Sequence, residues 1–151
     1  MKNGKLSLKY EVYIAAPTEK VWEALTEASA TKQYFYGCRV QSTFKKGSPI
    51  SYLGDGDFNM LDGKVLEVNP QKRLQTTFQA HWDEKVSKDK ASRVTWDLSP
   101  MGQATKLTLL HDQFDGETAT YTQSASGWNM ILSSLKTYLE TNKPLQLAQS
   151  G

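Results

Sequence analysis

The longest regular pattern of apolar and polar positions runs from about residue 120 to 142. Its apolar residues recur three or four positions apart, which is the spacing of one face of an α-helix. They are Tyr121, Ala125, Trp128, Leu132, Leu135 and Leu139, with Ile131 and Tyr138 widening the face. Thr120 and Gln123 have the spacing of a capping box, and Pro144 would stop the helix because proline cannot continue the hydrogen-bond ladder. A helix of roughly 33 Å with one apolar side requires a sheet to pack against.

The beginning of the chain predicts one strand followed by two short helices. Apolar and polar residues alternate from Leu6 to Ile14, as in a half-buried strand. Pro17 suits the first position of a short helix that ends near residue 27, since its fixed φ is helical and its missing N–H is not needed there. Ser29 would cap a second short helix that runs through Phe35 and closes at Gly37.

The middle of the chain predicts strands and turns only. Residues 83–91 form a charged stretch that we interpret as a loop. Strands that follow one another at short, regular intervals indicate an antiparallel meander rather than βαβ units. The six predicted strands are residues 40–44, 50–53, 58–68, 73–82, 92–98 and 105–114.

This order predicts a single α+β domain over residues 1–151, with its core in about 6–142 and a tail in 143–151. A strand, two short helices, a six-strand meander and a long helix would give a curved, seven-stranded antiparallel sheet. We expect the long C-terminal helix to pack across that sheet. A sheet curved over one helix commonly leaves an internal space, so the architecture itself favours a ligand cavity between the two.

Composition narrows the functional classes. A formal net charge of +2 over 151 residues is too small to indicate nucleic acid or an acidic membrane surface as a partner. The single cysteine, Cys38, excludes an internal disulfide and fits a reducing compartment. The chain has no apolar signal segment at its start and no run of eighteen apolar residues, so we expect a cytoplasmic protein without a membrane span.

Several segments, in order, resemble those of a known family. The chain resembles the helix-grip (START-like, or SRPBCC) superfamily and, within it, the family named for the activator of the heat-shock-protein-90 ATPase. The resemblance covers about residues 8–140 and implies the helix-grip fold. The matching segments are VYIAAPTEKVWEALT (12–26), GKVLEVNP (63–70) with Arg73-Leu74, VTWDL (94–98), TKLTL (105–109) with His111, and Gly127-Trp128 with Leu132 and Leu135.

The resemblance also carries functional implications. Many members of the family look like binders of hydrophobic ligands, while others have no known role. The co-chaperone that gives the family its name joins such a domain to a separate N-terminal domain, which binds the chaperone. Since this sequence begins at the first predicted strand, we expect that N-terminal domain to be absent.

The titratable residues offer one candidate for chemistry. His111 shares a strand face with Leu107 and Leu109 and should point inward. With an ordinary pKa near 6.5 it could bind a ligand or act as an acid or base, although we favour a structural histidine at the mouth of the core. His81 with Asp83 lacks further metal ligands, and the Asp55, Asp57 and Asn59 spacing departs from a calcium loop at Met60 and Leu66. We therefore predict no catalytic set, no metal and no cofactor.

The aromatic residues give the remaining signal. Most should belong to the core, but Trp96 on the inner sheet face and Trp128 on the long helix should face each other across any cavity. Their indole N–H groups also require partners when buried, which a ligand or water can provide. The predicted ligand-binding residues are Phe35, Phe58, Phe78, Trp96, Leu109, His111, Tyr121, Trp128 and Leu132.

Three functional hypotheses follow. The first is non-enzymatic binding of a hydrophobic or aromatic small molecule between the long helix and the curved sheet. The second is a cyclase- or hydrolase-type enzyme that uses His111 as acid or base. The third is an interaction with a chaperone, resembling the co-chaperone. The sequence leaves open the ligand, the pathway and whether the chain is a monomer or a homodimer.

Overall fold

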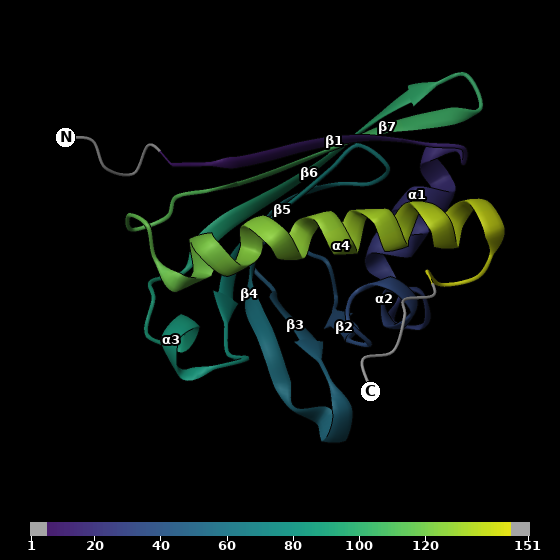
Figure 1. The fold of residues 1–151 in the computed structure, drawn as a ribbon. Helices are drawn as coiled ribbons and strands as arrows, with labels where there is room; N and C mark the ends of the chain where they lie inside the picture. Colours follow the sequence, from purple (N-terminus) through teal and green to yellow (C-terminus); the bar gives the residue numbers. More distant parts are fainter. Residues whose placement is uncertain (1–5, 146–151) are drawn as a thin grey trace.

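The computed structural model describes residues 6–145 (Figure 1). The predicted order of elements is confirmed, with one additional short helix and one 3-10 turn. The predicted tail, residues 143–151, lies mostly outside the described residues. The elements are β1 (Leu8–Ile14), α1 (Thr18–Thr26), α2 (Ala28–Tyr34), β2 (Arg39–Ser42), β3 (Pro49–Leu53), η1 (Asp55–Asp57), β4 (Asn59–Asn69), β5 (Arg73–Ala80), α3 (Glu84–Ser87), β6 (Ser92–Met101), β7 (Ala104–Asp112) and α4 (Ala119–Thr141).

The seven strands form one antiparallel sheet in the order β1-β7-β6-β5-β4-β3-β2. The meander from β2 to β7 pairs neighbours in sequence, and β1 joins its far edge by pairing Leu8 with His111 and Ile14 with Thr105. The register shifts in β3 between Tyr52 and Leu53 and in β4 between Val65 and Glu67. Such bulges bend a strand and increase its twist, so they help to curve this part of the sheet.

The long helix α4 crosses one face of the curved sheet, and α1 and α2 lie near its C-terminal half (Figure 1). Its buried face contains Trp128, Ile131, Leu132 and Leu135, as the apolar spacing predicts. Alternation also predicts the inner faces of the strands, where Val94, Trp96 and Leu98 are buried in β6 and Leu107, Leu109 and His111 are buried in β7. The predicted α+β helix-grip architecture is therefore confirmed.

Two local predictions about helix caps were wrong. The helix α4 begins at Ala119 with Thr118 as its cap, whose side chain accepts a hydrogen bond from the Tyr121 N–H, so Thr120 and Gln123 form no capping box. Thr120 instead donates both its N–H and its hydroxyl to Asp89. Ser29 lies inside α2, and no side chain caps that helix.

The charged stretch 83–91 was also predicted incorrectly as a loop. It contains the short helix α3, capped by Asp83, whose side chain accepts a hydrogen bond from the Val86 N–H at 2.9 Å. Val86 is fully buried, and Asp89 is the residue bonded to Thr120. One apolar anchor and one carboxylate thus tie this segment to β5 and to the start of α4. None of the helices in the described part of the chain has the length and apolar character needed to cross a membrane.

Candidate functional site

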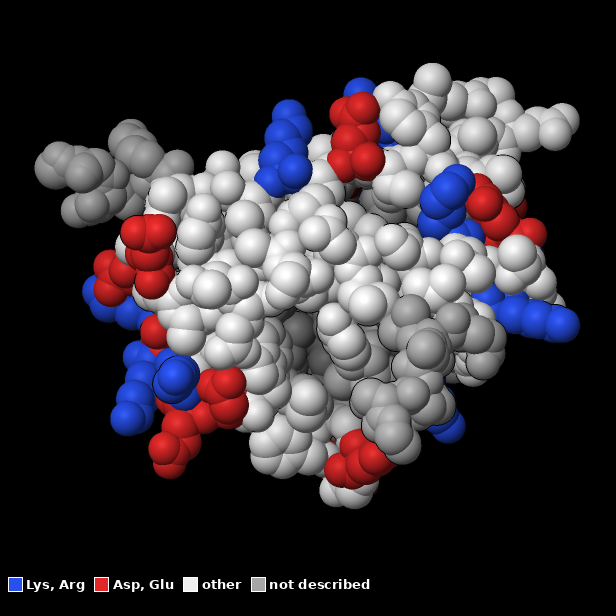
Figure 2. Space-filling view, in the orientation of Figure 1, with Lys and Arg blue, Asp and Glu red and all other residues white. Residues whose placement is uncertain are grey.

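A cavity of about 480 Å³ lies between α4 and the strands β4 and β5, next to the connection between α2 and β2. Small-molecule sites usually measure about 300–1,000 Å³, so this volume suits a small ligand. Figure 2 shows a hollow in the middle of this face, and its visible walls are residues without charge. The lining residues are Phe35, Tyr36, Cys38, Met60, Leu61, Phe78, Trp82, Gln123, Ser124, Ser126, Gly127, Trp128 and Ile131.

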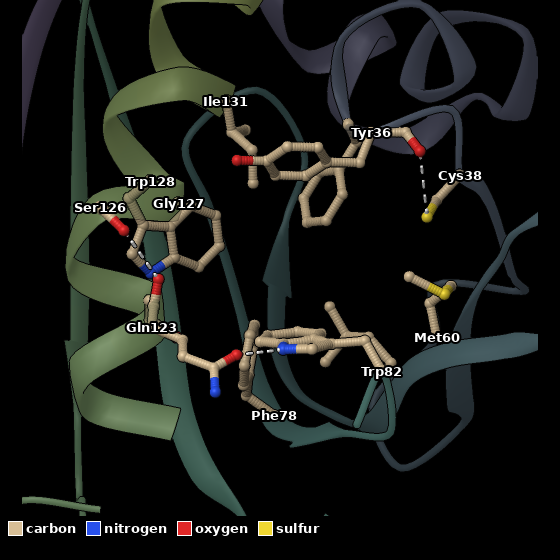
Figure 3. A pocket seen from close by; sticks show the side chains of 13 residues that line it. Tyr36, Cys38, Met60, Phe78, Trp82, Gln123, Ser126, Gly127, Trp128 and Ile131 are labelled. Carbon is tan, nitrogen blue, oxygen red and sulfur yellow. Dashed lines mark hydrogen bonds between the residues drawn. The ribbon is translucent and has the colours of Figure 1, made fainter. Parts of the chain in front are cut away.

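The walls of the cavity are mainly apolar and aromatic. Figure 3 shows Trp128 and Met60 on opposite sides of the space, with Tyr36 and Trp82 on the other two sides. None of the lining residues is Lys, Arg, Asp or Glu. A charged group on a ligand would therefore lose hydration without gaining an ion-pair partner, and the lining favours an uncharged molecule.

Trp128 forms the rigid inner wall. Its ring meets Phe35 at a centroid distance of 6.0 Å, Phe78 at 5.9 Å and Trp96 at 5.6 Å. These tilted and edge-to-face arrangements are the ones that aromatic rings prefer. Because Trp96 lies behind Trp128 and the indole is 2 % exposed, the wall has little freedom to move.

The indole N–H of Trp128 begins a buried chain of hydrogen bonds. It donates to Nδ1 of His111 at 2.9 Å, and Nε2 of His111 lies 2.7 Å from Oγ of Ser92. Since an indole N–H can only donate, Nδ1 must be unprotonated and the neutral imidazole carries its proton on Nε2. Nε2 then donates to Ser92, whose hydroxyl donates to the Phe78 carbonyl at 3.4 Å.

This chain determines the chemistry of His111. The side chain is completely buried, and burial lowers its pKa from 6.5 to about 3 because desolvation disfavours the charged imidazolium. Both ring nitrogens are occupied by protein partners, and His111 is not among the residues that line the cavity. Neither ring nitrogen of His111 is therefore free to exchange a proton with a ligand in this structure.

The predicted ligand-binding residues separate into two groups. Phe35, Phe78 and Trp128 line the cavity. Five others lie outside its lining: Trp96, Leu109, His111 and Leu132 are buried in the core, and Tyr121 packs edge-to-face on Phe114 at 5.0 Å.

Phe58 is the one predicted ligand-binding residue that the structure directs toward solvent. It follows the turn η1, where Asp57 has a φ of 62°, and its side chain is 52 % exposed. The chain reverses direction within this turn, so the apolar character of Phe58 gives no indication of where its side chain points. The structure does not bring Phe58 to the lining of this cavity.

Polar contacts hold Trp82 at the rim of the cavity, the part of its edge that lies next to α3. The indole N–H of Trp82 donates to Oε1 of Gln123 at 2.6 Å (Figure 3). Nε2 of Gln123 donates to Asp83 at 3.1 Å. Asp83 is the cap of α3, and its pKa is lowered chiefly by the hydrogen bond from the Val86 N–H. Trp82 is thus held by Gln123 of α4, and Gln123 is in turn held by Asp83, the cap of α3.

Across from this rim, Gly127 of α4 lies beside Tyr36. A Cβ atom at position 127 would meet only the Tyr36 hydroxyl, at 3.9 Å, so the glycine leaves open space in the cavity. Sequence reasoning did not assign either residue to the site. A usable signal existed, because glycine inside a helix costs about 1 kcal/mol relative to alanine and often has a packing or functional reason.

Cys38 and His81 have modest local roles. The Cys38 thiol is buried, which raises its pKa, and its sulfur lies 3.9 Å from the Tyr36 carbonyl, so it presents a thiol rather than a reactive thiolate. Nε2 of His81 lies 3.1 Å from Asp62. Within residues 6–145, no three His, Cys, Asp or Glu side chains come together as a possible metal site.

The model of the family "Activator of Hsp90 ATPase homolog 1-like protein" matches residues 15–140. The chain belongs to this family. Activator of Hsp90 ATPase homolog 1-like proteins have the helix-grip fold, which commonly binds small ligands, and the resemblance seen in the sequence is confirmed. None of the curated protein sequences matches this member of the family significantly.

Solved structures agree with membership of the activator of Hsp90 ATPase homolog 1-like family. A Mesorhizobium loti protein is 27 % identical with a TM-score of 0.75, over 89 % of this chain and 96 % of its own. DynU16, described as a putative protein in the dynemicin biosynthetic locus, is 30 % identical with a TM-score of 0.72, over 91 % of this chain and 48 % of its own. The Aha1 dimer from Colwellia psychrerythraea has a TM-score of 0.73 at 22 % identity, over 91 % of this chain and 98 % of its own, which shows the fold.

Proposed function

We propose that this protein binds an uncharged apolar or aromatic small molecule, without converting it, in the cavity between α4 and the sheet. The observation that carries the proposal is the 480 Å³ space with aromatic walls and no charged lining residue. The position of DynU16 in a biosynthetic locus is in keeping with a role near small molecules. Acid–base catalysis by His111 has less support, because both of its nitrogens are engaged and its pKa lies far below neutrality.

A variant that fills the cavity tests the proposal. Gly127→Leu projects a side chain into the open space beside Tyr36 and replaces the weakest helix former in α4. The fold should therefore persist while the volume available to a ligand shrinks. We expect Gly127→Leu to weaken binding of the uncharged fluorescent probe N-phenyl-1-naphthylamine by at least about tenfold, measured as probe fluorescence against protein concentration.

Asn129→Leu is the matched control, because it introduces the same residue on the exposed side of the same helix. It should bind the probe as the wild type does, and far-ultraviolet circular dichroism should show that both variants remain helical. Equal affinity of Gly127→Leu and wild type would place the probe elsewhere. The proposed function would be refuted if the wild type bound neither this probe nor any member of a panel of aromatic compounds and fatty acids.

A further inference from the structure

Ser124 breaks the apolar pattern of the cavity wall. It lies on the buried stripe of α4, four residues before Trp128, and lines the cavity. Its side chain is 5 % exposed, and its hydroxyl oxygen has no hydrogen-bond partner. A buried hydroxyl without a partner destabilises a fold, and serine is also a weaker helix former than alanine. Stability alone would therefore favour alanine at this position.

The other polar lining groups already have partners or contact water. Gln123 is held by Trp82 and Asp83, and Ser126 is exposed, with its hydroxyl directed to the Gln123 carbonyl at 3.4 Å. Tyr36 is 60 % exposed. Among the described residues that line the cavity, Ser124 is the one with a buried polar atom left unsatisfied.

We infer that the ligand of this cavity is an aromatic molecule with a neutral oxygen group, a carbonyl or hydroxyl, that hydrogen-bonds to Ser124. This inference rests on the proposed function and narrows its ligand class. A carboxylate would be buried without a cation, since none of the lining residues is basic. A pure hydrocarbon would leave the Ser124 hydroxyl as unsatisfied as it is in the free protein. A neutral oxygen satisfies the hydroxyl and adds no charge.

Two probes of nearly equal shape test this ligand class: 9-fluorenone, which carries a carbonyl, and fluorene, which has a methylene in the same position. Both are measured by displacement of N-phenyl-1-naphthylamine from the wild type. We expect 9-fluorenone to bind about tenfold more tightly than fluorene, the size of effect that one buried hydrogen bond produces. Fluorene-9-carboxylate should bind at least about tenfold more weakly than 9-fluorenone.

Ser124→Ala should bind 9-fluorenone and fluorene with about equal affinity. Its affinity for 9-fluorenone should fall, while its affinity for fluorene should not change. Without ligand, the melting temperature of Ser124→Ala should be between that of the wild type and about 2–4 °C above it, because an unsatisfied hydroxyl is removed. Ser133→Ala changes an exposed serine of the same helix that does not line the cavity, so it is the matched control and should keep the full preference.

The outcomes separate the inference from the function on which it rests. Equal wild-type affinity for fluorene and 9-fluorenone, or an unchanged preference in Ser124→Ala, would overturn the role of Ser124 while binding itself stands. A carboxylate that binds as tightly as the ketone would overturn the neutral class. If the wild type bound neither the probe nor either ring compound, the proposed function would fail together with this inference.

Discussion

Trp128→Ala is expected to lower the free energy of unfolding by about 3–5 kcal/mol, the range for deleting a large aromatic side chain from a core. The indole is buried and packs against Phe35, Phe78 and Trp96, so its removal leaves a void where the inner face of α4 meets the sheet. It also removes the only donor bonded to Nδ1 of His111 among the described residues. Urea unfolding followed by circular dichroism measures the loss without relying on tryptophan fluorescence.

Two further variants separate packing from hydrogen bonding. Trp128→Phe retains most of the ring contacts but leaves Nδ1 of His111 without a donor, and should cost about 1–3 kcal/mol, the range for an orphaned buried polar group. Trp82→Ala removes a tryptophan side chain from the partly exposed rim of the cavity. It should lower the free energy of unfolding by less than Trp128→Ala does. A loss below about 1 kcal/mol for Trp128→Ala would show that α4 does not depend on this contact.

The fold was largely predictable because its signals are local periodicities. Helical spacing predicted the face of α4 that contains Trp128 and Leu135, and alternation predicted the inward side chains of β6 and β7. The incorrect predictions concern segments whose structure depends on partners that are distant in the sequence. Thr120 is bonded to Asp89, thirty-one positions away, and α3 is anchored by the single apolar residue Val86, which is too little pattern to detect.

The cavity was harder to predict than the fold. Periodicity tells which side of an element faces inward, but not which inward residues meet a space and which meet other side chains. Trp96 and Trp128 both face inward, yet Trp96 lies behind Trp128 and only Trp128 lines the cavity. The departures from the apolar pattern of α4, Ser124 and Gly127, were the more informative positions. Natural chains break local rules mainly at functional or strained sites.

Acidification is expected to destabilise the protein through His111. The folded protein keeps the imidazole neutral, with a pKa of about 3, while the unfolded chain binds a proton at the ordinary pKa of 6.5. Between these values only the unfolded state takes up the proton, so this contribution to stability is complete above about pH 6.5 and declines as the pH falls toward 3. From pH 6.5 to 4.5 the loss should be about 2–3 kcal/mol, measurable by urea unfolding at each pH.

A variant without this histidine isolates its contribution. His111→Gln should be less stable than the wild type at pH 7, because the buried hydrogen-bond chain is disturbed, yet it should lose less stability on acidification. Carboxylates with lowered pKa values, such as Asp83, contribute the same acid loss to both proteins, so the difference between the two pH profiles belongs to position 111. Parallel profiles for wild type and His111→Gln would mean that the folded protein accepts a proton at this site, contrary to an imidazole enclosed by Trp128 and Ser92.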